Sequence, residues 1–271
     1  MTQHPPLPLS SLAHLPDHRI GGRAVLPAVD IMAALARVVL ASYPRCEVRS
    51  IGKVQLLRVL GVEELPRCAL SVRCEGEGPV RATLLSQLRA PNGMGRTREH
   101  AVVEFGIERA GPAALPPAAN GEFALEAARA YASLVPFGPW FHNLQGTLHL
   151  SPAGGHAQLR TPPGAPPDNL LGSPFLLDAA MHLACVWGQR YAGVTAIPVA
   201  LASRSIIHPI AQGQAACRIA WRGWSSDNLT FDVWLLDEQQ RLSEAATGLQ
   251  LMPQRSMAAP DWVREGAPVL V

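Results

Sequence analysis

Two long apolar stretches, residues 28–41 and 176–191, constrain the fold of this chain more than any other feature. The first follows Pro27 with helical spacing, and its apolar residues cover most of the helix circumference. The second carries almost no charge before Gln189 and Arg190. A helix that is apolar nearly all round must be buried. Each helix therefore needs its own covering of other secondary structure.

Strand-like runs supply that covering in both halves of the sequence. Many of them alternate polar and apolar residues, as expected for antiparallel strands with one wet face. In the first half they span 48–56, 67–74, 80–88 and 98–105; in the second, 144–150, 156–161, 197–207, 215–221, 229–236 and 248–252. We predict an α+β protein in which each half places antiparallel strands around one buried helix.

A charge-free segment rich in proline, alanine and glycine divides the two halves. We predict a first domain at 1–110, a linker at 111–122, a second domain at 123–253 and a tail at 254–271. Residues 1–14 are expected to be an extended lead, because they contain three prolines. Residues 123–134 are expected to form a short helix.

Composition excludes several classes of protein. A net charge of +2 argues against a nucleic-acid partner. Only Lys53 is lysine among 23 basic residues, a bias more typical of a GC-rich genome than of a phosphate-binding surface. The five cysteines include no CxxC pair, which argues against disulfide scaffolds and zinc knuckles. No signal peptide or membrane-spanning segment is present, so we expect a cytoplasmic protein. We also expect no metal, because no set of three or four ligands is indicated.

Two ionisable residues are candidates for chemistry. His18 precedes the first apolar helix, where a neutral imidazole can act as a base. Asp178 lies among apolar residues, where an ionised carboxylate is costly unless it is paired. Burial would raise its pKa and a helix N-terminus would lower it, so the sequence leaves the direction open. His182 lies one helical turn further on, on the same face, and can orient Asp178.

Structural alternatives exist for both residues. His18 can pair with Asp17 in a loop, and Asp178 can be a helix N-cap. His14 and His18 are spaced for a metal pair, although no further ligand is indicated. The histidines at 100, 142, 149, 156 and 208 and the six tryptophans are expected to be strand, loop or core residues.

A base and an acid in one apolar cleft suit a particular elimination. The base removes a proton alpha to a carbonyl, and the acid protonates a leaving group at the beta carbon. Each transfer typically contributes about 10²–10⁴-fold in rate. The developing enolate oxygen needs donors, which backbone N–H groups near Gly22 or at Pro27–Val29 can supply.

The motifs of both stretches together resemble the dehydratase domains of modular polyketide synthases. His18, Gly22 and Pro27 match the family's HxxxGxxxxP motif. Asp178 and His182 match its acid motif, in which Gln or His follows Asp by four residues. The similarity is colinear and covers about residues 15–252.

Two further segments carry the resemblance. Residues 173–179, SPFLLDA, correspond to the family's HPxLLDA and contain Pro174. Phe137, Gly138 and Pro139 begin FGPWF, which corresponds to YGPxF. A strand histidine of the first half has its counterpart at His100.

The resemblance implies a double-hotdog fold, two strand-wrapped helices side by side. It implies that His18 is the base, that Asp178 is the acid, that His182 steadies Asp178, and that Pro174 shapes the pocket. The substrate would be a 3-hydroxyacyl group on the phosphopantetheine arm of an acyl carrier protein, with no other cofactor. The product would be the 2,3-unsaturated thioester. The resemblance also makes a homodimer an open possibility.

The chain departs from the family pattern at three positions. Phe137 replaces a tyrosine, Ser173 a histidine, and Ala28 a glycine, which bears on specificity and rate more than on fold. The alternatives are a double-bond isomerase or cyclase with the same dyad, a hotdog thioesterase, and a non-catalytic module that binds acyl chains or carriers. Retention of His18 and Asp178 favours an enzyme. The sequence contains no carrier, ketosynthase or reductase segment and begins with Met1, which suggests a free-standing protein that acts in trans. The alternative is a domain excised from a larger synthase.

Overall fold

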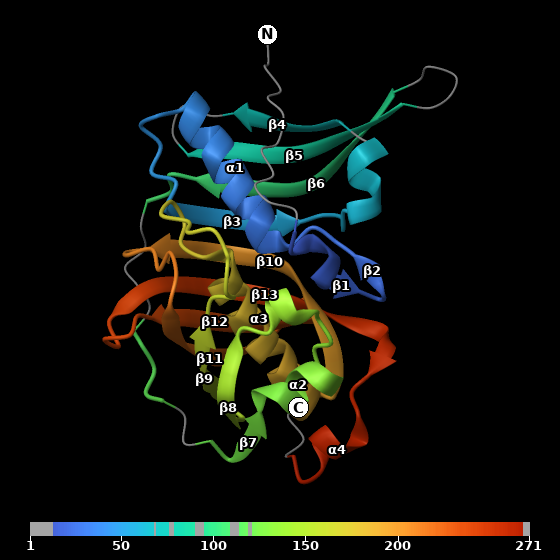
Figure 1. Ribbon diagram of the computed structural model, residues 1–271, viewed down its shortest axis with the longest axis vertical. Helices are drawn as coiled ribbons and strands as arrows, with labels where there is room; N and C mark the ends of the chain where they lie inside the picture. The colour runs from blue at the N-terminus through green and yellow to red at the C-terminus, as the bar shows by residue number, and fades with distance from the viewer. Residues whose placement is uncertain are drawn as a thin grey trace.

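Two helices, α1 (Ala28–Ser42) and α3 (Pro174–Trp187), contact each other and pack against one antiparallel sheet in the computed structural model, with α1 above α3 in Figure 1. The structure describes residues 13–67, 69–75, 79–89, 95–108, 114–118 and 121–267. The predicted α+β class, with one buried helix in each half, is confirmed.

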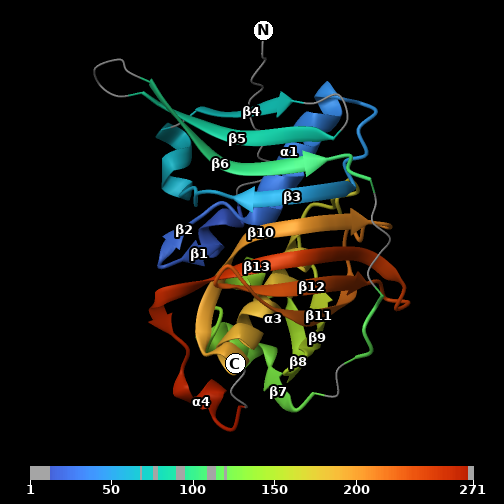
Figure 2. The same ribbon diagram turned by 180° about the vertical axis from the view of Figure 1, so that it is seen from behind.

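The strands of the first half cover α1. They are β3 (Ser50–Leu56), β4 (Ala69–Glu75), β5 (Val80–Arg89) and β6 (Gly95–Phe105). Figure 2, seen from behind, shows them stacked across the helix. Helix α1 contacts β4, β5 and β6, and Val29, Met32, Leu35 and Val39 are buried in this contact. Its N-cap is Pro27, whose fixed φ and missing N–H suit the start of a helix.

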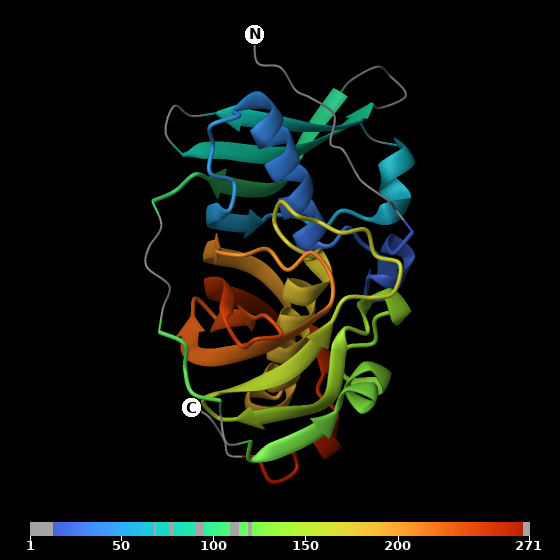
Figure 3. The ribbon, with the colours of Figure 1, turned by 60° about the vertical axis from the view of Figure 1, so that its left-hand side comes forward.

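The strands of the second half curve around α3 (Figure 3, green to red). They are β7 (Phe123–Glu126), β8 (Leu144–Ser151), β9 (Gly154–Arg160), β10 (Val194–Ile206), β11 (Gln214–Ser225), β12 (Asn228–Leu236) and β13 (Leu242–Ala258). Helix α3 is buried along thirteen of its residues. Pro174 is its first residue and Ser173 its N-cap, and a π-helical turn (Gly188–Ala192) follows it.

The two halves share one sheet in the order β4-β5-β6-β3-β10-β13-β12-β11-β9-β8-β7. The junction is the antiparallel pairing of β10 with β3, in which Leu201 lies opposite Val54. Helices α1 and α3 contact each other across this junction, and one hydrophobic core includes residues of both.

Three predicted elements differ from the structure. Residues 123–134 form the edge strand β7 and only then the short helix α2 (Ala127–Ser133), because Leu125 pairs with Leu148 of β8. Strand β13 runs beyond the predicted 248–252 in both directions, since it pairs with β10 on one side and β12 on the other. Helix α3 begins at Pro174, two residues before the predicted start.

A hairpin within the first motif was not predicted. Strand β1 (Arg19–Ile20) pairs with β2 (Arg23–Ala24) around Gly21 and Gly22. Both glycines have positive φ, 57° and 81°, as a two-residue type I′ hairpin turn requires. Gly22 therefore has a structural reason to be glycine.

Several sequence-based predictions lie outside the described residues. These are most of the lead at 1–14, Cys68, and residues 111–113, 119 and 120 of the predicted linker. The division into domains stays a prediction, although β13 extends past its boundary at 253 and α4 (Asp261–Arg264) lies in the predicted tail. Within the described part of the chain, no helix has the length and apolar character needed to cross a membrane.

A buried ion pair joins β10 and β13 next to the junction. Arg204 donates to both carboxylate oxygens of Glu244, at 2.7 and 2.9 Å, and to the carbonyl of Leu171 at 3.1 Å. Arg204 is 3% and Glu244 5% exposed. If one partner is removed, bulk water cannot reach the remaining charge to solvate it.

Replacing Arg204 by methionine is therefore expected to lower the free energy of unfolding by about 3–5 kcal/mol, because Glu244 is left charged and unpaired. Chemical denaturation measures this change. The double variant Arg204→Met/Glu244→Leu should recover most of the loss, and a double variant as unstable as the single one would contradict the explanation.

Candidate active site

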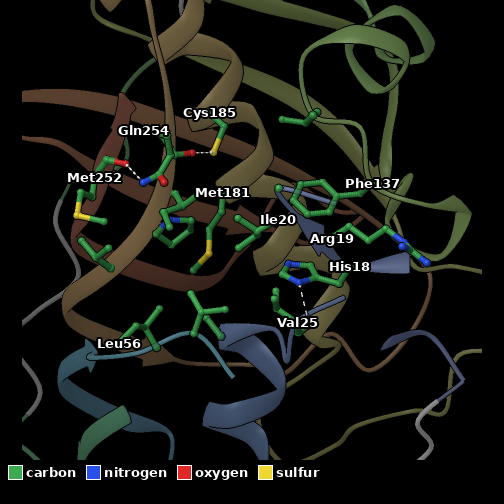
Figure 4. Close-up of a pocket in the computed structure, with 18 of the residues that line it drawn as sticks. His18, Arg19, Ile20, Val25, Leu56, Phe137, Met181, Cys185, Met252 and Gln254 are labelled. Carbon is green, nitrogen blue, oxygen red and sulfur yellow. Dashed lines mark hydrogen bonds between the residues drawn. The ribbon is translucent and has the colours of Figure 1, made fainter. Parts of the chain in front are cut away.

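A cavity of about 400 Å³ opens between the β1–β2 hairpin, the start of α1, the middle of α3 and the adjoining ends of β10 and β13. Figure 4 shows His18 and Phe137 on one side of it and Met252 and Gln254 on the other. Among the predicted site residues, those that line the cavity are His18, Gly22, Phe137, Asp178 and His182; those that do not are Pro27, Pro174, Gly138 and Pro139.

His18 is presented by the hairpin. Its Nδ1 lies 3.2 Å from the carbonyl oxygen of Val25, and the Val25 N–H donates to the carbonyl of His18 at 2.9 Å. With the hydrogen on Nδ1 donated to Val25, the lone pair of Nε2 is free to accept a proton. Val25 is thus a site residue that the motif did not reveal, because its contribution is a backbone carbonyl.

The environment of His18 favours the neutral form. Burial is the largest influence and lowers its pKa, and the nearby His182 lowers it further. Asp178, the Val25 carbonyl and Asp30 act in the opposite direction without reversing the shift. The pKa of His18 lies below its ordinary value of 6.5, so at neutral pH this side chain is a base ready to accept a proton.

Asp178 lies in the second turn of α3, five residues after the N-cap Ser173, so the interpretation of Asp178 as an N-cap is wrong. Its Oδ1 is 3.9 Å from Nε2 of His18, and its Oδ2 is 3.0 Å from Nε2 of His182. The fold therefore brings together the base of one half and the acid of the other.

The structure gives the direction of the pKa shift of Asp178, which the sequence left undecided. Burial is the largest single influence and raises it. The neighbouring imidazoles of His182, His18 and His14 together outweigh burial, so the pKa is lowered from 3.8. The carboxylate is stable inside the protein because histidines surround it.

Phe137 lies between the two imidazoles. Its ring stacks on His18 with centroids 4.9 Å apart and on His182 at 4.4 Å, with interplanar angles of 19° and 13°. A phenyl ring donates no hydrogen bond, so at this position the chain fixes ring orientation by stacking alone.

Gly138 and Pro139 support the site from behind. The Gly138 N–H donates to the carbonyl of Asp17 at 2.8 Å, and the Trp140 N–H donates to its carboxylate at 3.0 Å. Pro139 begins the short 3-10 turn that makes this contact possible. Asp17 is therefore engaged with Trp140, and its predicted alternative pairing with His18 is wrong.

His14 belongs to the surroundings of the site. Its Nε2 is 2.7 Å from Oδ2 of Asp30 in the first turn of α1, and its ring packs edge-on against Phe175 at 5.3 Å. It does not form a metal pair with His18. The described residues include no group of three or more histidine, cysteine or acidic side chains placed to hold a metal.

Cys185 lines the cavity but is not a nucleophile. Burial, with a smaller contribution from Asp178, raises the pKa of its thiol to about 12, and the thiol donates to the carbonyl of Ala196 at 3.3 Å. The nucleophilic form is the thiolate, which is negligible at neutral pH. A covalent acyl-cysteine route is therefore disfavoured.

Tyr131 is a second residue that the sequence did not reveal. It lies on α2, outside every motif, and its hydroxyl approaches Nδ1 of His182 at 3.4 Å. Nothing in the alanine-rich stretch around it indicates a position near the site.

Fold and site together define a double-hotdog protein with a His–Asp dyad in the cavity between its halves. The family model described as "Polyketide synthase dehydratase N-terminal domain" matches residues 110–260, more than half of the chain. The chain belongs to the polyketide synthase dehydratase family, and it is a hydro-lyase of 3-hydroxyacyl intermediates.

The chain is also similar to proteins of known sequence and structure. Over 209 residues the chain is 26% identical to one component of the polyunsaturated fatty acid synthase of a Thraustochytrium species, covering 73% of this chain and 7% of that much longer protein. The dehydratase domain from the CurJ module of curacin polyketide synthase shares the fold, with a TM-score of 0.70 and 15% identity over 90% of this chain and 88% of that one. The dehydratase domain of PpsC from Mycobacterium tuberculosis also shares the fold, with a TM-score of 0.66 and 20% identity over 90% of each chain.

A side chain at position 138 should disturb the support behind His18. A Cβ on Gly138 would lie 2.4 Å from Cγ of Asp17, closer than non-bonded atoms approach. We expect Gly138→Ala to lower the free energy of unfolding by about 1–3 kcal/mol. Denaturant titration measures this. Asp17→Gly removes the obstructing side chain, so strict additivity of the two substitutions would contradict the proposed clash.

Proposed function

We propose that this chain removes water from a 3-hydroxyacyl thioester carried on the phosphopantetheine arm of an acyl carrier protein. His18 takes the proton from C2, Asp178 delivers a proton to the C3 hydroxyl, and a 2,3-enoyl thioester and water leave. The observation that carries the proposal is the separation of 3.9 Å between Nε2 of His18 and Oδ1 of Asp178 inside a largely apolar cavity.

The spacing of the dyad suits two reacting groups on adjacent carbons. A base and an acid this close can reach the C2 hydrogen and the C3 hydroxyl from the same face of the substrate. We therefore propose a syn elimination. The apolar lining excludes water, which strengthens the electrostatic interactions that stabilise the transition state.

The acid requires a proton that the isolated carboxylate does not hold at neutral pH, since the pKa of Asp178 is lowered. Elimination therefore proceeds from the protonated form of Asp178, with Nε2 of His182 3.0 Å from Oδ2 of the same carboxyl group. After water leaves, the proton on His18 returns across 3.9 Å to Asp178, and the dyad is restored.

The surroundings of the cavity support an acyl chain on a carrier. Leu57 and Val59 are exposed at the cavity, 47% and 55%, and Arg19 and Arg58 line the same cavity. Arginines next to an apolar opening suit the phosphate of a pantetheine arm and an acidic carrier surface. The PpsC dehydratase domain was solved in complex with C12:1-CoA, an acyl thioester on the same arm. The reaction as proposed uses no other cofactor.

The decisive experiment follows loss of one water from 3-hydroxyacyl thioesters on pantetheine and on carrier protein by mass spectrometry. His18→Ala and Asp178→Asn are each expected to slow water loss by about 10²-fold or more. His208→Ala and Asp227→Asn change the same residue types outside the cavity and should leave the rate unchanged. Full activity of either dyad variant would refute the assignment.

The same experiment separates the other functions. NMR of the product places the double bond at C2–C3 for a dehydratase and elsewhere for an isomerase. Release of free thiol would indicate a thioesterase. Carrier binding without water loss, across a panel of chain lengths and both hydroxyl configurations, would indicate a binding module.

The pH dependence of kcat/KM tests the role of His18 independently. Protonated His18 cannot accept the C2 proton, so the rate should fall as pH decreases through its pKa. Because burial lowers this pKa, the midpoint of the acid limb is expected below pH 6.5. A midpoint at or above 6.5 would mean that another group controls this limb.

A further inference from the structure

The buried hydroxyl of Tyr131 has an unusually complete set of neighbours. The backbone N–H groups of Asn143 and Leu144 both donate to it, at 3.0 and 2.9 Å. Nδ1 of His182 lies 3.4 Å from the same oxygen. The side chain is 5% exposed, and its ring stacks on His142 with centroids 4.4 Å apart. The geometry points to Tyr131 as a positioning residue that fixes the tautomer of His182 and thereby the face that Asp178 presents to the substrate.

A phenol has a limited hydrogen-bonding capacity. The oxygen accepts two hydrogen bonds and donates one. Two backbone N–H groups occupy both acceptor positions. The hydroxyl hydrogen must then point elsewhere, and Nδ1 of His182 is the acceptor in reach. Burial raises the pKa of Tyr131 far above its ordinary value, so this hydrogen stays on the phenol.

This hydrogen bond determines the tautomer of His182. An Nδ1 that accepts from Tyr131 carries no hydrogen, so the ring hydrogen is on Nε2. Nε2 lies 3.0 Å from Oδ2 of Asp178, although the present orientation lacks the alignment of a hydrogen bond. Neither of these buried atoms has a hydrogen-bond partner among the described residues.

The tautomer decides which oxygen of Asp178 can carry the acid proton. When Nε2–H faces Oδ2, that oxygen is an acceptor, and the proton of the acid belongs on Oδ1. Oδ1 is the oxygen that faces His18, at 3.9 Å, across the space where the substrate reacts. With the other tautomer, a bare Nε2 would draw the proton to Oδ2, away from the substrate.

This role rests on the proposed dehydratase function, but its first test does not. In protein with ¹⁵N-labelled histidine, NMR distinguishes a protonated Nε2 from a protonated Nδ1, and His182→Gln identifies the signal of His182. The wild-type protein is expected to show the Nε2–H form. A predominant Nδ1–H form would overturn the inference, whether or not the protein dehydrates any substrate.

Kinetics supply the second test. Tyr131→Phe is expected to lower kcat by about 10- to 100-fold with little change in KM, because a misplaced acid impairs chemistry rather than binding. The substitution also leaves two backbone N–H groups unpaired, so its stability must be measured alongside. Tyr191→Phe, which removes another phenol hydroxyl outside the cavity, is the matched control and should retain full kcat.

A double-variant cycle separates positioning from general damage. Glutamine at position 182 has no tautomers, so in the His182→Gln background Tyr131→Phe should change kcat by less than about 2-fold. An equal loss of kcat in both backgrounds would mean that Tyr131 only supports the fold. If Tyr131→Phe does not fold, the wild-type NMR measurement still decides the question.

Discussion

The carboxylate of Asp178 is the constraint on which the architecture of the site depends. Its helix is buried on every side, and a charge there is tolerated only with compensation. Three histidines from two parts of the chain provide it, and their combined influence exceeds that of burial. The apolar helix α3 therefore bears an acidic side chain, and the strands that bury α3 also separate this side chain from water.

The compensating partners come from outside the helix as well as from within it. His182 is on α3 itself, whereas His18 reaches Asp178 from a hairpin in the other half. Phe137 stacks on both imidazoles and so keeps them nearly parallel to its own ring. Asp17 in turn holds the segment that carries Phe137, through the backbone of Gly138 and Trp140. Residues of three separate segments thus form one stacked and hydrogen-bonded unit.

Most of the fold and the central pair of residues could be predicted from the sequence. Hydrophobic periodicity located both helices and the strands, because the signal is local. The motifs located His18, Asp178 and His182, and the structure brings all three to one cavity. Pro27, Pro174, Gly138 and Pro139 match the family motifs without lining the cavity, since they define helix starts and a close backbone contact.

What the sequence could not predict depends on contacts between distant segments. Strand β7 looks helical because Ala124, Leu125 and Glu126 all favour a helix, and pairing with β8 overrides that preference. Val25 acts through its carbonyl, and Tyr131 acts from a helix without any motif. The direction of the pKa shift of Asp178 depended on distances to three imidazoles, which no spacing along the chain reveals.

The pairing of β10 with β3 makes the two halves one continuous sheet. The relative position of base and acid is consequently set by this pairing, by the contact of α1 with α3 and by the hydrogen bonds from Gly138 and Trp140 to Asp17. All of these contacts join segments that are distant in sequence. A circular permutation that keeps them is therefore compatible with an unchanged dyad, whatever the order in which the segments are connected.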